Sequence, residues 1–164
     1  MELENTGRKI VMGLGNTLNK DEGLGVHALE ILEKKLAALA PDVEFVDGGA
    51  LGLNLLPWVE EASHLLVLDS VVSRFSLPGQ VMELKKEEIP LYQNIKMSDH
   101  QITFQEVLGI AKIRDHFPEY LHLVGAQPVD MNIGYGMSPE IEAIIPQILE
   151  RAERVLREWG LLLS

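Results

Sequence analysis

The stretch HLLVLDSVV, residues 64–72, decides the fold of this chain. It is almost continuously apolar, as expected of a strand that helices cover on both faces of a parallel sheet. One carboxylate, Asp69, interrupts the run, and buried acids are usually paired or bound to a metal because an unpaired buried charge is costly. Asp69 is therefore a candidate site residue, and the alternative is a salt bridge to a nearby base such as Arg74.

Four further segments have strand patterns, and helical patterns alternate with them. Residues 9–13, 43–47 and 120–126 are short apolar runs, and residues 80–84 alternate after the turn signal Pro78-Gly79, which predicts antiparallel pairing. Amphipathic or capped helices are expected over residues 21–40, 50–61, 98–114 and 139–159. This alternation predicts an α/β fold with a mostly parallel, five-stranded mixed sheet. We expect one domain over residues 1–164, with residues 1–8 as a flexible tail.

The composition excludes several classes of function. The net charge is −11, so nucleic acid and anionic membranes are poor partners. There is no cysteine, which excludes thiolate nucleophiles and leaves His, Asp, Glu or backbone oxygen as ligands of any metal. The first residues lack a signal-peptide pattern, and no apolar run approaches the roughly 20 residues that span a bilayer. We therefore expect a cytoplasmic protein.

Acidic residues and one histidine are predicted to meet at a single edge of the sheet, because ligands bind outside the carboxyl ends of parallel strands. Asp47 and Asp69 end two strands, Glu22 follows the first strand, and His100 opens a later helix. Crowded carboxylates repel one another unless a cation intervenes. Glu22, Asp69 and His100 together form a candidate metal site with open coordination positions, which suits zinc, nickel, iron or manganese.

Each candidate also has a purely structural interpretation. Asp21 fits a helix cap better than a ligand, and Asp47 before two glycines fits a turn former equally well. The Gly13-x-Gly15 pair resembles a dinucleotide-binding loop. However, Leu18 stands where the third glycine belongs, and Asp21-Glu22 place negative charge where a pyrophosphate would bind. These glycines more readily form a tight turn that brings backbone close to a ligand or peptide.

Four motifs in order resemble the hydrogenase maturation endopeptidases: GLGNTLNKDEGLG at 13–25, DGGALG at 47–52, LDSV at 68–71 and SDHQ at 98–101. The segment LVGAQP at 123–128 is also similar, and the resemblance covers residues 9 to about 159. It implies a three-layer α/β/α sandwich. It also implies an aspartic-type endopeptidase that removes a C-terminal extension from the precursor of the nickel–iron hydrogenase large subunit after nickel insertion.

The resemblance further implies roles for individual residues. Glu22, Asp69 and His100 fall on the family's metal-contacting positions, and Asp47 falls on a motif that positions the substrate backbone or takes part in hydrolysis. The candidate substrate-binding residues are Gly15, Asn16, Gly48 and Gly49. Nickel would arrive with the substrate, with zinc or cadmium as substitutes in vitro. The loop at 128–138 is the candidate segment for choosing the partner, and the resemblance does not identify which hydrogenase is processed.

Two alternatives of other classes stay open at this point. One is a nucleotide- or NAD-binding enzyme, which the first glycine pair and Asp47 suggest. The other is a non-catalytic, nickel-handling protein that binds the same large subunit.

Overall fold

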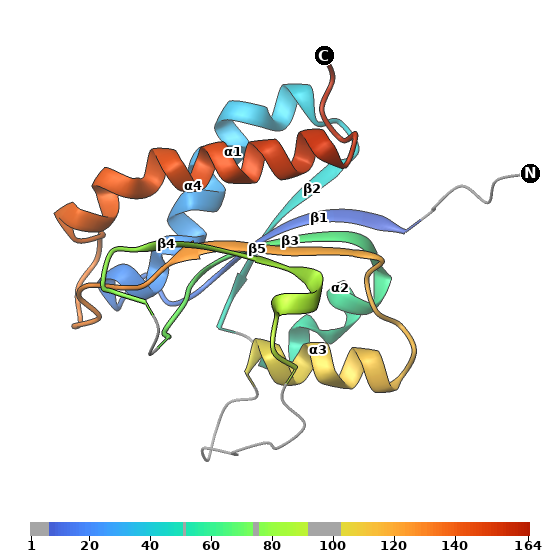
Figure 1. The fold of residues 1–164 in the computed structure, drawn as a ribbon, viewed down its shortest axis with the longest axis horizontal. Coiled ribbons are helices and arrows are strands. Elements are labelled where there is room, and N and C mark those ends of the chain that lie inside the picture. Colours follow the sequence, from blue (N-terminus) through green and yellow to red (C-terminus); the bar gives the residue numbers. More distant parts are fainter. Residues whose placement is uncertain (1–6, 51, 74–75, 92–102) are drawn as a thin grey trace, which may run out of the picture.

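The computed structural model describes residues 7–50, 52–73, 76–91 and 103–164. They form three layers, with a central sheet between two pairs of helices (Figure 1). Helices α1 (Leu24–Leu36) and α4 (Pro139–Glu158) pack on one face, whereas α2 (Leu56–Glu61) and α3 (Phe104–Ile113) pack on the other. The predicted α/β sandwich is confirmed.

The sheet has five strands in the order β2-β1-β3-β5-β4. All neighbouring pairs are parallel except β4 with β5, so the antiparallel strand predicted after Pro78-Gly79 is confirmed. The strands are β1 (Arg8–Leu14), β2 (Val43–Gly49), β3 (Ala62–Ser70), β4 (Val81–Lys85) and β5 (Tyr120–Ala126).

Strand β3 lies at the centre of the sheet and supplies both halves of the core. Leu66 and Leu68 pack with α1 and α4, while Leu65 and Val67 pack with α2 and α3, because successive side chains of a strand point to opposite faces. All four side chains are completely buried. Asp69 comes two residues after Val67, so its side chain points to the same face of the sheet, the one that α2 and α3 cover.

Two predicted boundaries were wrong. Strand β1 already includes Arg8, which we placed in the tail, because its guanidinium pairs with Glu44 on the neighbouring β2 and with Glu61 and lies over the Trp58 ring. Helix α3 begins at Phe104 after Thr103, whose hydroxyl accepts a hydrogen bond from the Glu106 backbone in a capping box. The capping box predicted at 98–101 lies outside the described residues.

Helix α1 lies unusually close to the sheet, because glycines remove the side chains at its contact with β1 and β3. A Cβ atom on Gly25 would lie 2.1 Å from the Leu68 carbonyl oxygen and 2.4 Å from that of Leu14. A Cβ atom on Gly13 would lie 2.6 Å from the carbonyl oxygen of Gly25. The predicted helix at 21–40 is divided, with 3₁₀ turns at Lys20–Gly23 and Ala37–Leu39 on either side of α1.

Among the described residues, no helix combines the length and the apolar character that a membrane crossing requires.

The close contact at Gly25 and helix propensity predict opposite changes in stability for Gly25→Ala. Gly25→Ala in an exposed helix would stabilise the protein by up to about 1 kcal/mol. Here the added methyl group meets backbone oxygens that cannot turn away, so we expect a loss of about 3 kcal/mol or more. Urea denaturation followed by circular dichroism measures the change.

Gly160→Ala is the control, because a Cβ atom there meets nothing within 4 Å and only the positive φ of 75° opposes it. Its cost should stay near 1 kcal/mol, the strain of a left-handed residue. An equal loss in both variants would contradict the close-contact explanation.

Candidate functional site

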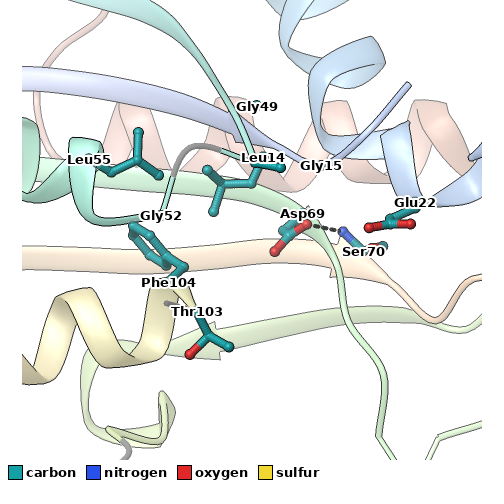
Figure 2. Close-up of a pocket in the computed structure, with 11 residues that line it drawn as sticks. Leu14, Gly15, Glu22, Gly49, Gly52, Leu55, Asp69, Ser70, Thr103 and Phe104 are labelled. Atoms are coloured by element: carbon teal, nitrogen blue, oxygen red, sulfur yellow. Dashed lines mark hydrogen bonds between the residues drawn. The ribbon is translucent and has the colours of Figure 1, made fainter. Parts of the chain in front are cut away.

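A pocket of about 230 Å³ opens at the carboxyl ends of the parallel strands. The ends of β1, β2 and β3 form one side of it, and the start of α3 forms another (Figure 2). Its lining residues include Leu14, Gly15, Glu22, Gly49, Leu55, Asp69, Ser70, Thr103 and Phe104. Two predicted metal ligands, Glu22 and Asp69, therefore share one pocket.

Asp69 carries a carboxylate that the surrounding protein compensates poorly. Burial raises the pKa of Asp69 to about 7, the hydrogen bond from the Ser70 N–H opposes that rise, and the charge of Glu22 adds to it. The Ser70 nitrogen lies 2.8 Å from Oδ1 (Figure 2). No ion pair to Asp69 forms among the described residues, and the predicted alternative partner, Arg74, lies outside them.

Glu22 reaches the pocket from the 3₁₀ turn that precedes α1. Its Oε2 accepts a hydrogen bond from Nδ2 of Asn19 at 3.0 Å, which fixes one oxygen. Two carboxylates that face one cavity repel each other, and a cation between them would relieve both the repulsion and the burial of Asp69. The arrangement therefore fits oxygen ligation of a metal.

The third predicted ligand, His100, lies outside the described residues. Within the part of the chain that the structure describes, no three His, Cys, Asp or Glu side chains gather as a metal site. The structure thus brings Glu22 and Asp69 together and leaves the assignment of His100 a prediction.

Asp47 lies at the carboxyl end of β2 but does not line the pocket. Its side chain is exposed, and Oδ1 accepts the N–H of Gly49 at 2.9 Å, which is the bond of a turn former. That turn has a direct link to the site, because the Gly49 carbonyl oxygen accepts the N–H of Gly15 and both glycines line the pocket. Asp47 thus shapes the pocket wall through the backbone.

The other two candidate substrate-binding residues lie outside the pocket lining. Asn16 accepts the N–H of Leu18 in a local turn. Gly48 is buried, and a Cβ atom there would lie 2.8 Å from the Leu14 side chain.

The glycines of the first loop do not leave room for a pyrophosphate. A Cβ atom on Gly15 would lie 1.9 Å from the Glu22 carbonyl oxygen, so this glycine, with φ of +125°, allows the chain to turn tightly against the next segment. Gly13 and Gly25 serve helix–sheet packing. The geometry therefore disfavours the dinucleotide-binding alternative, and Glu22 occupies the position that an anion would need.

Asp21 is completely buried, and its predicted role as a helix cap was wrong. Its carboxylate instead accepts four hydrogen bonds from a distant loop, donated by the Val129, Asp130 and Ser138 backbone nitrogens and by the Ser138 hydroxyl at 2.7 to 3.0 Å. The backbone N–H of Asp21 also donates to Asp130. Asp21 thus fastens the loop at 128–138 beside the segment that carries Glu22.

Sequence reasoning missed the apolar wall of the pocket. Leu14, Leu55 and Phe104 gave only the ordinary signal of core residues. The sequence does contain a signal for Thr103. Thr103 and Glu106 have the T-x-x-E spacing of a capping box, which marks the start of α3 at the pocket rim.

The raised pKa of Asp69 predicts that this residue destabilises the free protein above neutral pH. The folded-state pKa of about 7 exceeds the ordinary value of 3.8, so the penalty is absent below pH 4, grows with pH and is complete above pH 7. Asp69→Asn keeps the acceptor for the Ser70 N–H and should stabilise the fold at pH 8 by on the order of 2 to 4 kcal/mol.

Urea unfolding at pH 4 and pH 8 tests this, with Asp47→Asn as the matched control at an exposed carboxylate. The control should change stability by less than about 0.5 kcal/mol at either pH. A pH-independent effect of Asp69→Asn would show that Asp69 is already compensated.

The four hydrogen bonds to Asp21 predict a large cost for an equal-sized amide. In Asp21→Asn an NH₂ group must face backbone N–H donors, so we expect a loss of about 2 to 4 kcal/mol. Asp130→Asn removes only the partner of Lys20 in a partly exposed ion pair and should cost less than about 1 kcal/mol. Equal unfolding free energies for the two variants would contradict the anchoring role.

The comparisons with known proteins agree with this geometry. The family model described as hydrogenase maturation protease matches residues 26–155. The hydrogenase 2 maturation protease of Escherichia coli is 38% identical over 154 residues, which is 93% of each chain. The hydrogenase expression/formation protein HupD of Rhizobium leguminosarum is 40% identical over 93% of this chain and 76% of its own length.

A solved structure gives the same result. The hydrogenase maturating endopeptidase HybD from E. coli superimposes with a TM-score of 0.82 and 37% identity, covering 93% of this chain and 94% of its own. The chain therefore belongs to the hydrogenase maturation protease family, and it is an endopeptidase.

Proposed function

We propose that this endopeptidase removes a C-terminal extension from the nickel-loaded precursor of a nickel–iron hydrogenase large subunit in the cytoplasm. The nickel is part of the substrate, and the enzyme uses it to recognise a precursor that is ready for cleavage. One observation carries the proposal: Glu22 and Asp69 face a single pocket, and Asp69 has one hydrogen-bond donor and no cationic partner among the described residues.

The ligand chemistry supports nickel as the recognised ion. Carboxylate and imidazole are suitable ligands of nickel and zinc, so we assign His100 as the third contact. A metal that is held by only a few side chains of the enzyme keeps open coordination positions, and ligands from the precursor itself can fill them. Zinc or cadmium should occupy the same carboxylates in vitro.

Water is the nucleophile in this proposal, because the sequence has no cysteine. Among the described residues that line the pocket, only Glu22 and Asp69 can accept the proton that the attacking water loses. Asp47 acts as a positioning residue through the turn at Gly48-Gly49. Docking of the nickel beside the scissile bond supplies proximity, which can contribute several kcal/mol, about 7 or more in favourable cases.

The test is cleavage of the purified precursor, with and without nickel, followed by intact mass. The nickel-loaded precursor should lose its extension, and the nickel-free precursor should remain whole. Glu22→Gln, Asp69→Asn and His100→Ala should each slow cleavage by about 100-fold or more, since each removes a contact on which positioning depends.

Asp42→Asn is the control, because Asp42 is an exposed acid that precedes the opposite end of β2. It should process normally. Equal cleavage of both precursors would refute nickel recognition, and normal processing by His100→Ala would remove His100 from the site.

A further inference from the structure

A second hollow, of about 610 Å³, begins at Asp69 and extends along the other half of the sheet. Asp69 and Ser70 line both hollows. The first pocket lies over the ends of β1, β2 and β3, whereas the second lies over β3, β5 and the edge strand β4. Because β3 is central in the strand order, the two hollows flank Asp69 on opposite sides. We refer to the second hollow as the β4 groove.

The floor of the β4 groove is apolar. Met82 and Leu84 of β4 line it together with Leu123 of β5, and Ile89 and Pro90 follow at one wall. Leu84 and Leu123 pack with the α2/α3 core, which is also the side to which alternation assigns Asp69. The groove and the carboxylate therefore lie on the same face of the sheet.

The charged groups among the described residues that line the β4 groove are all acidic. Glu88 is exposed beside it and forms no ion pair with a described residue, and Asp69 stands at its inner end. No Lys or Arg is among the described lining residues. Such a surface favours an apolar peptide with neutral or basic side chains and repels an acidic one.

The two hollows suit different parts of one substrate. The first pocket offers two carboxylates to a metal, whereas the β4 groove, beyond Asp69, offers apolar side chains and one distant acid. A chain whose metal-bearing part is held at Glu22 and Asp69 can continue past Asp69 into the β4 groove, on the other side of β3, because Asp69 and Ser70 line both hollows. Strand β4 has five residues, about 16 Å, so an extended peptide of about five residues spans it.

We propose that the β4 groove binds the C-terminal extension of the precursor, as an extended apolar peptide with neutral or basic side chains, while the metal-bearing body stays on the Glu22 side. This inference rests on the proposed function and names the subsite that the removed segment occupies.

The test compares binding of two forms of the large subunit to variants of the full-length enzyme. Val72→Asp places a charge at the rim, where Val72 is 70% exposed and the fold tolerates it, and Leu84→Ala shortens the floor. Each variant should bind the nickel-loaded precursor about tenfold more weakly and should bind the nickel-loaded subunit that lacks the extension as the wild type does. Because the active enzyme cuts the precursor, the affinity for the precursor is taken from KM in intact-mass time courses, and the affinity for the shortened subunit from its inhibition of the same cleavage.

Ile113→Asp is the matched control, because Ile113 is 82% exposed at the far end of α3, about 14 Å from Phe104 along the helix. It should leave both affinities unchanged. Equal loss of affinity for both forms of the subunit would show that the groove binds the body of the subunit instead. Unchanged affinity of Val72→Asp for the precursor would show that the groove does not bind the extension. Either result overturns the inference. Failure of the wild type to cut the precursor would instead sink the proposed function.

Discussion

The site depends on the close contact between α1 and the backbones of β1 and β3. Gly25 lies against the carbonyl oxygens of Leu14 and Leu68, closer than any residue with a side chain could lie. Glu22 is three residues before Gly25, and Asp69 directly follows Leu68. The contact therefore fixes how far apart the backbone segments that carry the two carboxylates lie, and it does so through backbone atoms that cannot relax as side chains can.

Asp21 and Asp69 show how the same chemical group, a carboxylate, can serve stability in one place and function in another. Asp21 is completely buried, and four donors satisfy its carboxylate. Asp69 accepts one hydrogen bond among the described residues, from the Ser70 N–H, and burial with the neighbouring Glu22 raises its pKa to about 7. Buried polar groups are normally satisfied by protein donors, as Asp21 is, whereas the carboxylate of Asp69 at the pocket wall stays accessible to a ligand.

The sequence predicted those features that depend on local pattern and general topology. The apolar run at 64–72 indicated a central strand, and the rule that parallel strands end at one edge brought Glu22 and Asp69 together. The function of Asp21 was not predictable in this way, because its partners lie more than 100 residues away. Asp47 shows a third case, since its turn bond was one of two interpretations that the sequence left open, and its exposed position outside the pocket lining was not predicted.

Neither the strand order nor the β4 groove followed from the sequence. Hydrophobic alternation assigns a residue to a face of the sheet, but it does not say which strands are neighbours. The order β2-β1-β3-β5-β4 places β4 at an edge beyond β5, and only this order separates the two hollows on either side of Asp69. The division of the site follows from tertiary pairing of segments such as β3 and β5, whose paired residues, for example His64 and Tyr120, are 56 positions apart in the chain.

In the proposed function, the enzyme recognises the metal because the neighbouring carboxylates of Glu22 and Asp69 are unfavourable without a cation between them. Burial of Asp69 beside Glu22 costs free energy in the free enzyme once Asp69 is ionised, and a bound cation relieves this cost. A precursor without the cation gains no such relief, and every 1.4 kcal/mol of difference, about the free energy of one pKa unit, discriminates roughly tenfold. Compensation of Asp69 by a protein cation would stabilise the enzyme and remove that discrimination, so metal recognition in this proposal requires that Asp69 has no cationic partner, as is the case among the described residues.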